Sequence, residues 1–174
     1  MKAPTLLTTK DFGGDKSFLL KWAAMRMPHM AEHGFGPDSV PVAVVKGTGA
    51  HDARLLAVVI FNTFNAQAKS IQISCASDSP MWAHPETLRE LLRYPFEQLG
   101  CFMVWTMIGC ENERSIRFNR KAMGMRQHGP IPHVFGEGKH AFIMQMTRHQ
   151  WARKWKEVTH GNAIERRQFN TCRA

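Results

Sequence analysis

The stretch from Ser70 to Gly124 constrains the fold most strongly, because its hydrophobic periodicity changes along the chain. Residues 70–77 (SIQISCAS) alternate apolar and polar side chains, which is the period-two pattern of a strand. Over residues 86–99 the apolar side chains fall on one helical face. Residues 101–109 (CFMVWTMIG) then form a continuous apolar run, which predicts a strand buried on both faces.

A second helix is predicted over residues 111–123 (ENERSIRFNRKAM), with Gly124 as its C-terminal stop. The whole stretch therefore predicts a strand–helix–strand–helix unit. Two strands joined by one helix in this way lie parallel, with a right-handed crossover. The polar loop at residues 78–85 presents backbone N–H groups at a helix start, where an anion such as a phosphate can bind.

The rest of the chain predicts further strands and two helices. Extended segments are expected over residues 5–8, 40–46, 54–64, 125–135 and 140–146. An amphipathic helix is predicted to begin at the cap Asp15, to end near Pro28 and to bury Phe18, Leu19, Trp22, Met25 and Met30. Trp151 and Trp155 indicate a short C-terminal helix.

The chain of 174 residues predicts one domain. No apolar run approaches the roughly 20 residues that span a bilayer, and the N-terminus has no signal-peptide pattern. We therefore expect a cytoplasmic protein that does not bind membranes. The four cysteines show no CxxC spacing, which favours reduced thiols over disulfides or a metal site.

Basic residues are concentrated at the C-terminal end of the chain. The net charge is +9, and residues 148–174 carry seven Lys and Arg against two Glu, a net charge of +5. We expect a domain over residues 1–160 and a basic tail over residues 161–174. Such a tail can attract nucleic acid, an acidic partner or an anionic cofactor, or it can be a solvated end.

Four short motifs resemble the GNAT acyltransferase superfamily, and most closely its small phage or prophage acetyltransferases. They are the segments 77–80 (SDSP), 94–100 (YPFEQLG), 112–115 (NERS) and 118–119 (FN). The resemblance covers roughly residues 15–151. It implies an α/β single domain with a mixed, mostly antiparallel sheet flanked by helices, in which a central parallel strand pair splays apart. It also implies an N-acyltransferase that moves an acetyl group from acetyl-CoA to a primary amine.

The resemblance implies that the splayed strands bind the pantetheine of acetyl-CoA and that the following helix start binds its pyrophosphate. The cofactor contacts implied are Ser74, Cys75, Ser77, Trp82, Ala83, His84, Thr87, Asn112, Ser115 and Arg117. Met81, His84 and Glu86 stand where the family has Arg, Gly and Gly or Ala. Backbone N–H groups would therefore have to hold the anion without glycine.

Catalytic and acceptor residues are also implied by the resemblance. Asn119 stands nearest to the position where many family members have a tyrosine that protonates the leaving thiolate, so Asn119 and Ser115 are the catalytic candidates. Phe35 and Phe64 are candidate substrate-binding residues, and ordinary packing is the alternative for Phe35. The sequence identifies neither a general base nor the acceptor, and it leaves a homodimer open.

Two other functions fit the same sequence. The chain could be a GNAT-fold protein that acts on or binds nucleic acid through its basic tail. It could also be a degenerate, non-catalytic interaction module.

Overall fold

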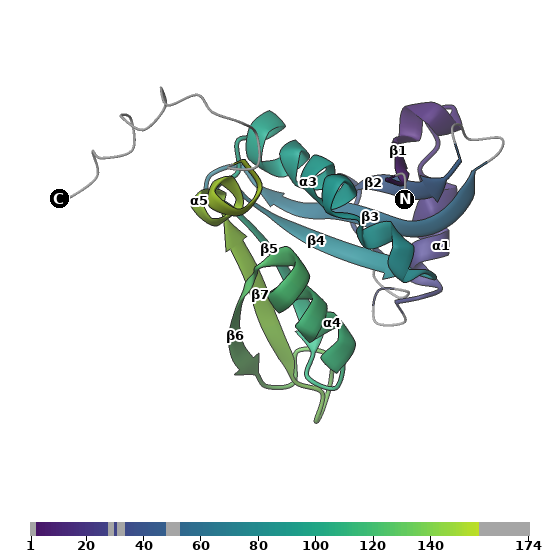
Figure 1. Ribbon diagram of the computed structural model, residues 1–174. Helices are drawn as coiled ribbons and strands as arrows, with labels where there is room; N and C mark the ends of the chain where they lie inside the picture. Colours follow the sequence, from purple (N-terminus) through teal and green to yellow (C-terminus); the bar gives the residue numbers. More distant parts are fainter. Residues whose placement is uncertain (1–2, 28–29, 31–33, 48–52, 157–174) are drawn as a thin grey trace, which may run out of the picture.

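One seven-stranded sheet runs through the described part of the computed structural model, which comprises residues 3–27, 30, 34–47 and 53–156. The strand order is β1-β2-β3-β4-β5-β7-β6, and every neighbouring pair is antiparallel except β4 and β5 (Figure 1). The strands are β1 (Thr5–Leu7), β2 (Val40–Lys46), β3 (Arg54–Asn65), β4 (Ser70–Ser77), β5 (Met103–Gly109), β6 (Arg126–Ile131) and β7 (Ala141–Thr147). The predicted fold class is thereby confirmed.

Helices cover both faces of this sheet. They are α1 (Ser17–Ala24), α3 (Pro85–Arg93), α4 (Glu113–Phe118) and α5 (Arg148–Trp151), and short 3-10 turns lie at Thr9–Phe12 and Pro80–Ala83. π-Helical turns extend the last three helices over Tyr94–Gln98, Asn119–Met123 and Ala152–Lys156. No helix among the described residues is long and apolar enough to cross a membrane.

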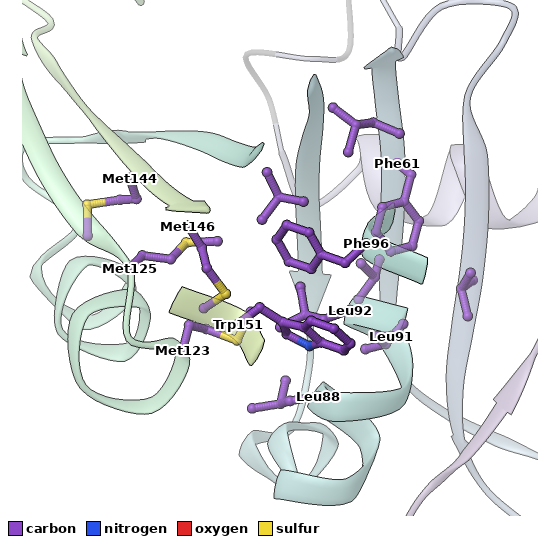
Figure 2. Close-up of a cluster of buried hydrophobic side chains, with 14 of the residues drawn as sticks. Phe61, Leu88, Leu91, Leu92, Phe96, Met123, Met125, Met144, Met146 and Trp151 are labelled. Carbon is purple, nitrogen blue, oxygen red and sulfur yellow. The ribbon is translucent and has the colours of Figure 1, made fainter. Parts of the chain in front are cut away.

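Strand alternation divides the core into two layers. In β3, Val58 and Ile60 pack with Leu19 and other residues of the α1 layer. The neighbouring Phe61 packs on the other face, in the layer under α3, α4 and α5. In that layer the rings of Phe96 and Trp151 stack, with their centroids 5.3 Å apart. Four methionines belong to the same layer: Met123, Met125, Met144 and Met146 (Figure 2).

The strand–helix–strand–helix unit agrees with its sequence pattern. β4 has the predicted bounds, α3 begins one residue earlier than predicted, and Gly124 ends the second helix with a φ of +79°. A positive φ is easily adopted by glycine, which explains why the helix stops there. The expectation that the second strand is buried on both faces is wrong, because Trp105, Thr106 and Met107 are only half-buried.

The predicted buried face of the first helix is partly wrong. Phe18 and Met25 are 58% and 74% exposed, whereas Leu19 and Ala23 are fully buried against the sheet. The helix presents two apolar rows, and the row that contains Leu19 and Ala23 is the one that packs. The expected helix end at Pro28 and the tail over residues 161–174 lie outside the described residues.

Removing a side chain from the layer under α3 should destabilise the fold. Leu92 is 1% exposed, so Leu92→Ala should lower the free energy of unfolding by about 2–5 kcal/mol because it leaves a cavity. Phe18→Ala on the exposed row is the control and should change it far less. Chemical denaturation of the three proteins measures both effects. An equal loss for the two variants would contradict the assignment of the core.

Candidate functional site

The site begins where the two parallel strands separate. β4 and β5 pair at three positions, which are Ser70 with Met103, Ile71 with Val104 and Gln72 with Trp105. β4 continues to Ser77 beside β3, and β5 continues to Gly109 beside β7, without further pairing between them. Figure 1 shows the two strands diverging beyond this junction. Their facing backbone edges are therefore left without a strand partner inside the sheet.

A cleft of about 1470 Å³ occupies this gap. Its walls include the separated parts of both strands, residues 73–77 and 106–109. Leu91 and Met123 of the α3 layer line it, and so do Arg26 and Met27, which follow α1. The cleft therefore connects the two faces of the sheet. Its volume exceeds the roughly 300–1,000 Å³ of an ordinary ligand pocket.

The structure brings most of the predicted cofactor and catalytic residues to this cleft. Those that line it are Ser74, Cys75, Ser77, Trp82, Ala83, Asn112, Ser115 and Asn119. His84, Thr87, Arg117, Phe35 and Phe64 do not line it. Phe35 is buried in the α1 layer, which is the packing alternative, and Phe64 is 42% exposed beyond the cleft. The roles assigned to all of these residues stay predictions.

Cys75 lies on the β4 wall, on the same side of the sheet as its partner Val59 in the α3 layer. The residue is exposed on the cleft, and desolvation of its thiol by the surrounding protein raises the pKa to about 12. The thiol therefore stays protonated at neutral pH and is a poor nucleophile.

The loop after β4 satisfies several of its own backbone N–H groups. Ser79 Oγ accepts a hydrogen bond from the N–H of Met81 at 3.3 Å, and His84 Nδ1 accepts one from the N–H of Glu86 at 3.4 Å. Pro80 and Pro85 have no N–H to offer. The loop therefore presents fewer outward N–H groups than the sequence led us to expect.

The side chain of Thr87 lies against the segment before β1 and does not line the cleft. This side chain is buried, and its hydroxyl donates to the carbonyl oxygen of Pro4 at 3.5 Å. This contact ties the start of α3 to the segment before β1.

The first turns of α4 place one face of that helix on the cleft. Asn112 caps the helix, because its Oδ1 accepts a hydrogen bond from the N–H of Ser115 at 3.0 Å. Asn119 is 9% exposed, and its Nδ2 donates to the carbonyl oxygen of Ser115 at 3.0 Å. Arg114 lies on the cleft, whereas Arg117 lies in a shallow depression with Arg120.

An ion pair joins Arg26, a residue of the cleft wall, to Asp78 in the loop after β4. Arg26 Nε lies 2.7 Å from Asp78 Oδ1, and Arg26 Nη2 lies 2.6 Å from Asp78 Oδ2. The same guanidinium stacks over the Trp22 ring, 3.6 Å from its centroid. The segment that follows α1 is thereby joined to the loop after β4. The paired residues are 52 positions apart, so sequence reasoning had no local signal for this contact.

Three charged residues on the cleft were missed by the sequence analysis: Arg26, Glu111 and Lys139. Lys139 belongs to the loop between β6 and β7, which forms the remaining wall. Glu111 stands directly before Asn112 of the NERS motif, and this position was the only available signal for it. No group of metal-ligating side chains occurs among the described residues.

Comparisons with known proteins give likenesses at the level of structure. A chimera of the spermidine N-acetyltransferase SpeG from Vibrio cholerae and hSSAT matches with a TM-score of 0.64 at 13% identity, covering 84% of this chain and 98% of that chain. Mutant forms of the spermidine/spermine N-acetyltransferase SpeG from Vibrio cholerae match with a TM-score of 0.64 at 15% identity, covering 86% of this chain and 98% of that chain. A search of protein-family models finds no match, and a search of curated proteins finds none.

These likenesses establish the fold. Together with the single parallel pair β4–β5 in an otherwise antiparallel sheet, they show that the chain has the GNAT fold of these acetyltransferases. Fold alone does not fix an activity, because activity depends on the residues of the site.

The ion pair between Arg26 and Asp78 should make stability depend on pH. Hydrogen bonding to Arg26 holds the pKa of Asp78 below its ordinary value of 3.8 in the folded protein. The contribution of Asp78 to stability is therefore present above pH 3.8 and is lost as the pH falls through the lowered pKa. Asp78→Asn should be less stable than the wild type at pH 6, and this difference should shrink as the pH falls below about 3.8.

Urea denaturation across this pH range measures the difference. Arg26→Gln serves as the partner variant and should show the same pH profile. In a double-mutant cycle, the two substitutions together should destabilise the protein less than the sum of their separate effects. A difference between wild type and Asp78→Asn that does not vary with pH would contradict the role of the ion pair.

Proposed function

We propose that this protein is an N-acyltransferase that transfers an acetyl group from acetyl-CoA to a primary amine. The observation that carries the proposal is the separation of β4 and β5 after Gln72 and Trp105. The separated strands leave backbone donors and acceptors on the cleft, where the amides of a pantetheine arm can pair as an added strand would. The activity of the structural neighbours, which are named as spermidine N-acetyltransferases, supports acetyl transfer to an amine.

The transfer requires a neutral amine and a polarised thioester. The amine lone pair attacks the acetyl carbonyl carbon, the carbon–sulfur bond then breaks, and CoA leaves as a thiolate. The amine loses one proton to solvent, and the thiolate gains one. Ser115 is the cleft residue proposed to donate a hydrogen bond to the departing sulfur. Asn119, fixed by its bond to the Ser115 carbonyl, orients that helix turn and offers its amide to the thioester oxygen.

The phosphates of CoA require positively charged side chains close to where they bind. Arg114 on α4 lines the cleft there, and Lys139 lines it from the loop between β6 and β7. Arg117 faces away from the cleft with Arg120 and Lys121, so its contact would have to be with a part of CoA that extends outside. The loop after β4 contributes fewer free N–H groups, and side-chain charge would carry more of the anion binding.

A non-catalytic binding module is the second candidate, and the loop after β4 favours it. In the place where a phosphate would approach, two prolines have no N–H to donate. Two further N–H groups already donate to the side chains of Ser79 and His84. Such a module would bind a ligand in the cleft without consuming acetyl-CoA. The nucleic-acid alternative depends on the basic tail over residues 161–174, which lies outside the described residues. That alternative, a cytoplasmic location, a homodimer and the phage-type resemblance remain predictions.

Filling the cleft should weaken binding of the donor. Cys75→Trp places an indole on the β4 wall, and we expect it to weaken acetyl-CoA binding at least about tenfold because the pantetheine arm loses its space. Cys75→Ser keeps a small side chain and is the matched control, with an affinity near that of the wild type. Isothermal titration calorimetry gives the affinities, and thermal unfolding checks that each variant is folded.

Turnover must be measured separately from binding. We expect release of free CoA from acetyl-CoA in the presence of an amine, with formation of the acetylated amine detected by mass spectrometry. Binding of acetyl-CoA without any acetylated product from a broad set of primary amines would support the binding module instead. Equal donor affinity in wild type and Cys75→Trp would contradict the location of the donor site.

A further inference from the structure

Glu111 is the one carboxylate among the described residues that line the cleft. The other charged side chains on its walls are Arg26, Arg114 and Lys139. Arg26 is already paired with Asp78. Within the described residues Glu111 has no ion pair or hydrogen bond, although the chain carries a large excess of cations. The cleft therefore presents to a ligand one solvent-exposed carboxylate that has no ion-pair partner among the described residues.

The position of Gly109 shows on which side of the sheet this carboxylate lies. In β5, Val104 and Ile108 face the α3 layer, so the alternate position Gly109 faces the opposite side, where α1 packs. A Cβ built on Gly109 would lie 2.3 Å from Glu111 Oε1 and 2.7 Å from its Cδ. The carboxylate thus fills the space that a side chain at position 109 would take. It lies on the α1 side of the sheet.

This placement separates the charges in the cleft. The proposed donor carries several negative phosphates. Its expected contacts on α4 and at Cys75 lie on the α3 side, whereas Ser74 points to the α1 side. A carboxylate on the α3 side would repel the donor, whereas one on the α1 side faces the space left for the acceptor. An unpaired carboxylate is complementary to a protonated amine, which it binds by a charge-assisted hydrogen bond.

An amine attacks a thioester through its lone pair, which a protonated nitrogen lacks. A carboxylate that held the reacting nitrogen would have to accept its proton as a general base, whereas a carboxylate that only binds a cation holds a second basic group of the same acceptor. A general base would act on monoamines and diamines alike, so a preference for diamines distinguishes the two roles. We propose that Glu111 is a specificity-determining residue that binds a second, protonated nitrogen, and that the acceptor is an aliphatic amine with at least two basic nitrogens. This inference rests on the proposed function for its assignment of the acceptor side.

Two matched probes test the inference without requiring turnover. Cadaverine is a linear diamine, and pentylamine is its counterpart with one nitrogen. Calorimetry should show that the wild-type protein binds cadaverine more tightly than pentylamine. Glu111→Gln should weaken cadaverine binding about tenfold, while pentylamine binding changes less than about twofold.

Two further variants test whether the position of the negative charge matters, and not only its presence in the protein. Glu113→Gln removes the same charge from an exposed residue of α4 that does not line the cleft, and it should leave cadaverine binding unchanged. Gly109→Ala keeps Glu111 but forces its carboxylate to move, and it should weaken cadaverine binding in the same direction as Glu111→Gln. Equal effects of Glu111→Gln and Glu113→Gln, or equal wild-type affinity for the two amines, would overturn the proposal.

Steady-state kinetics with acetyl-CoA then distinguishes failure of this inference from failure of the proposed function. If both hold, Glu111→Gln raises KM for cadaverine about tenfold with little change in kcat. Efficient acetylation of pentylamine and cadaverine with equal kcat/KM would refute the role of Glu111 and leave the acyltransferase intact. Glu111-dependent cadaverine binding without any acetylated product would refute acyl transfer and leave the amine site intact.

Discussion

The site depends on the point where the hydrogen-bonded ladder between β4 and β5 ends. Three residue pairs hold these parallel strands together, and beyond Gln72 and Trp105 each strand keeps only its outer partner. Unpaired backbone inside a sheet is unfavourable unless water or a ligand satisfies it. The fold tolerates the gap because β3 and β7 support the outer edges and α3 and α4 cover one face. The cleft follows from this single interruption.

Because side chains alternate along a strand, the two faces of the cleft carry different residues. Odd positions of β4, such as Cys75, face α3 and α4, where the cap and hydrogen bonds of α4 fix Asn112, Ser115 and Asn119. Odd positions of β5 point to the opposite side of the sheet, and Gly109 leaves room there for the carboxylate of Glu111. The two faces of the cleft therefore carry different side chains, with the amide and hydroxyl groups of α4 on one face and the carboxylate of Glu111 on the other.

The parts of this structure that local patterns determine were predictable from the sequence. Changes of period marked β4, α3, β5 and α4, and the NERS and FN motifs marked the face of α4 that lines the cleft. Contacts between distant segments were not predictable, as with Arg26 and Asp78. Both apolar rows of α1 looked suitable for burial, and only packing against the sheet selects Leu19 over Phe18. The carboxylate of Glu111 takes its position because Gly109 has no side chain. Hydrophobic periodicity in the sequence does not reveal such a contact.

Hydrogen exchange by NMR tests most directly whether the gap between β4 and β5 is a binding cleft for an acyl thioester. In the free protein, the cleft-facing amides within residues 73–77 and 106–109 should exchange much faster than those of the paired residues 70–72. Saturating acetyl-CoA should protect the cleft-facing amides and leave the paired residues unchanged. If acetyl-CoA leaves these amides unprotected, or protects only residues outside the cleft, then the gap between β4 and β5 is not the binding site of an acyl thioester.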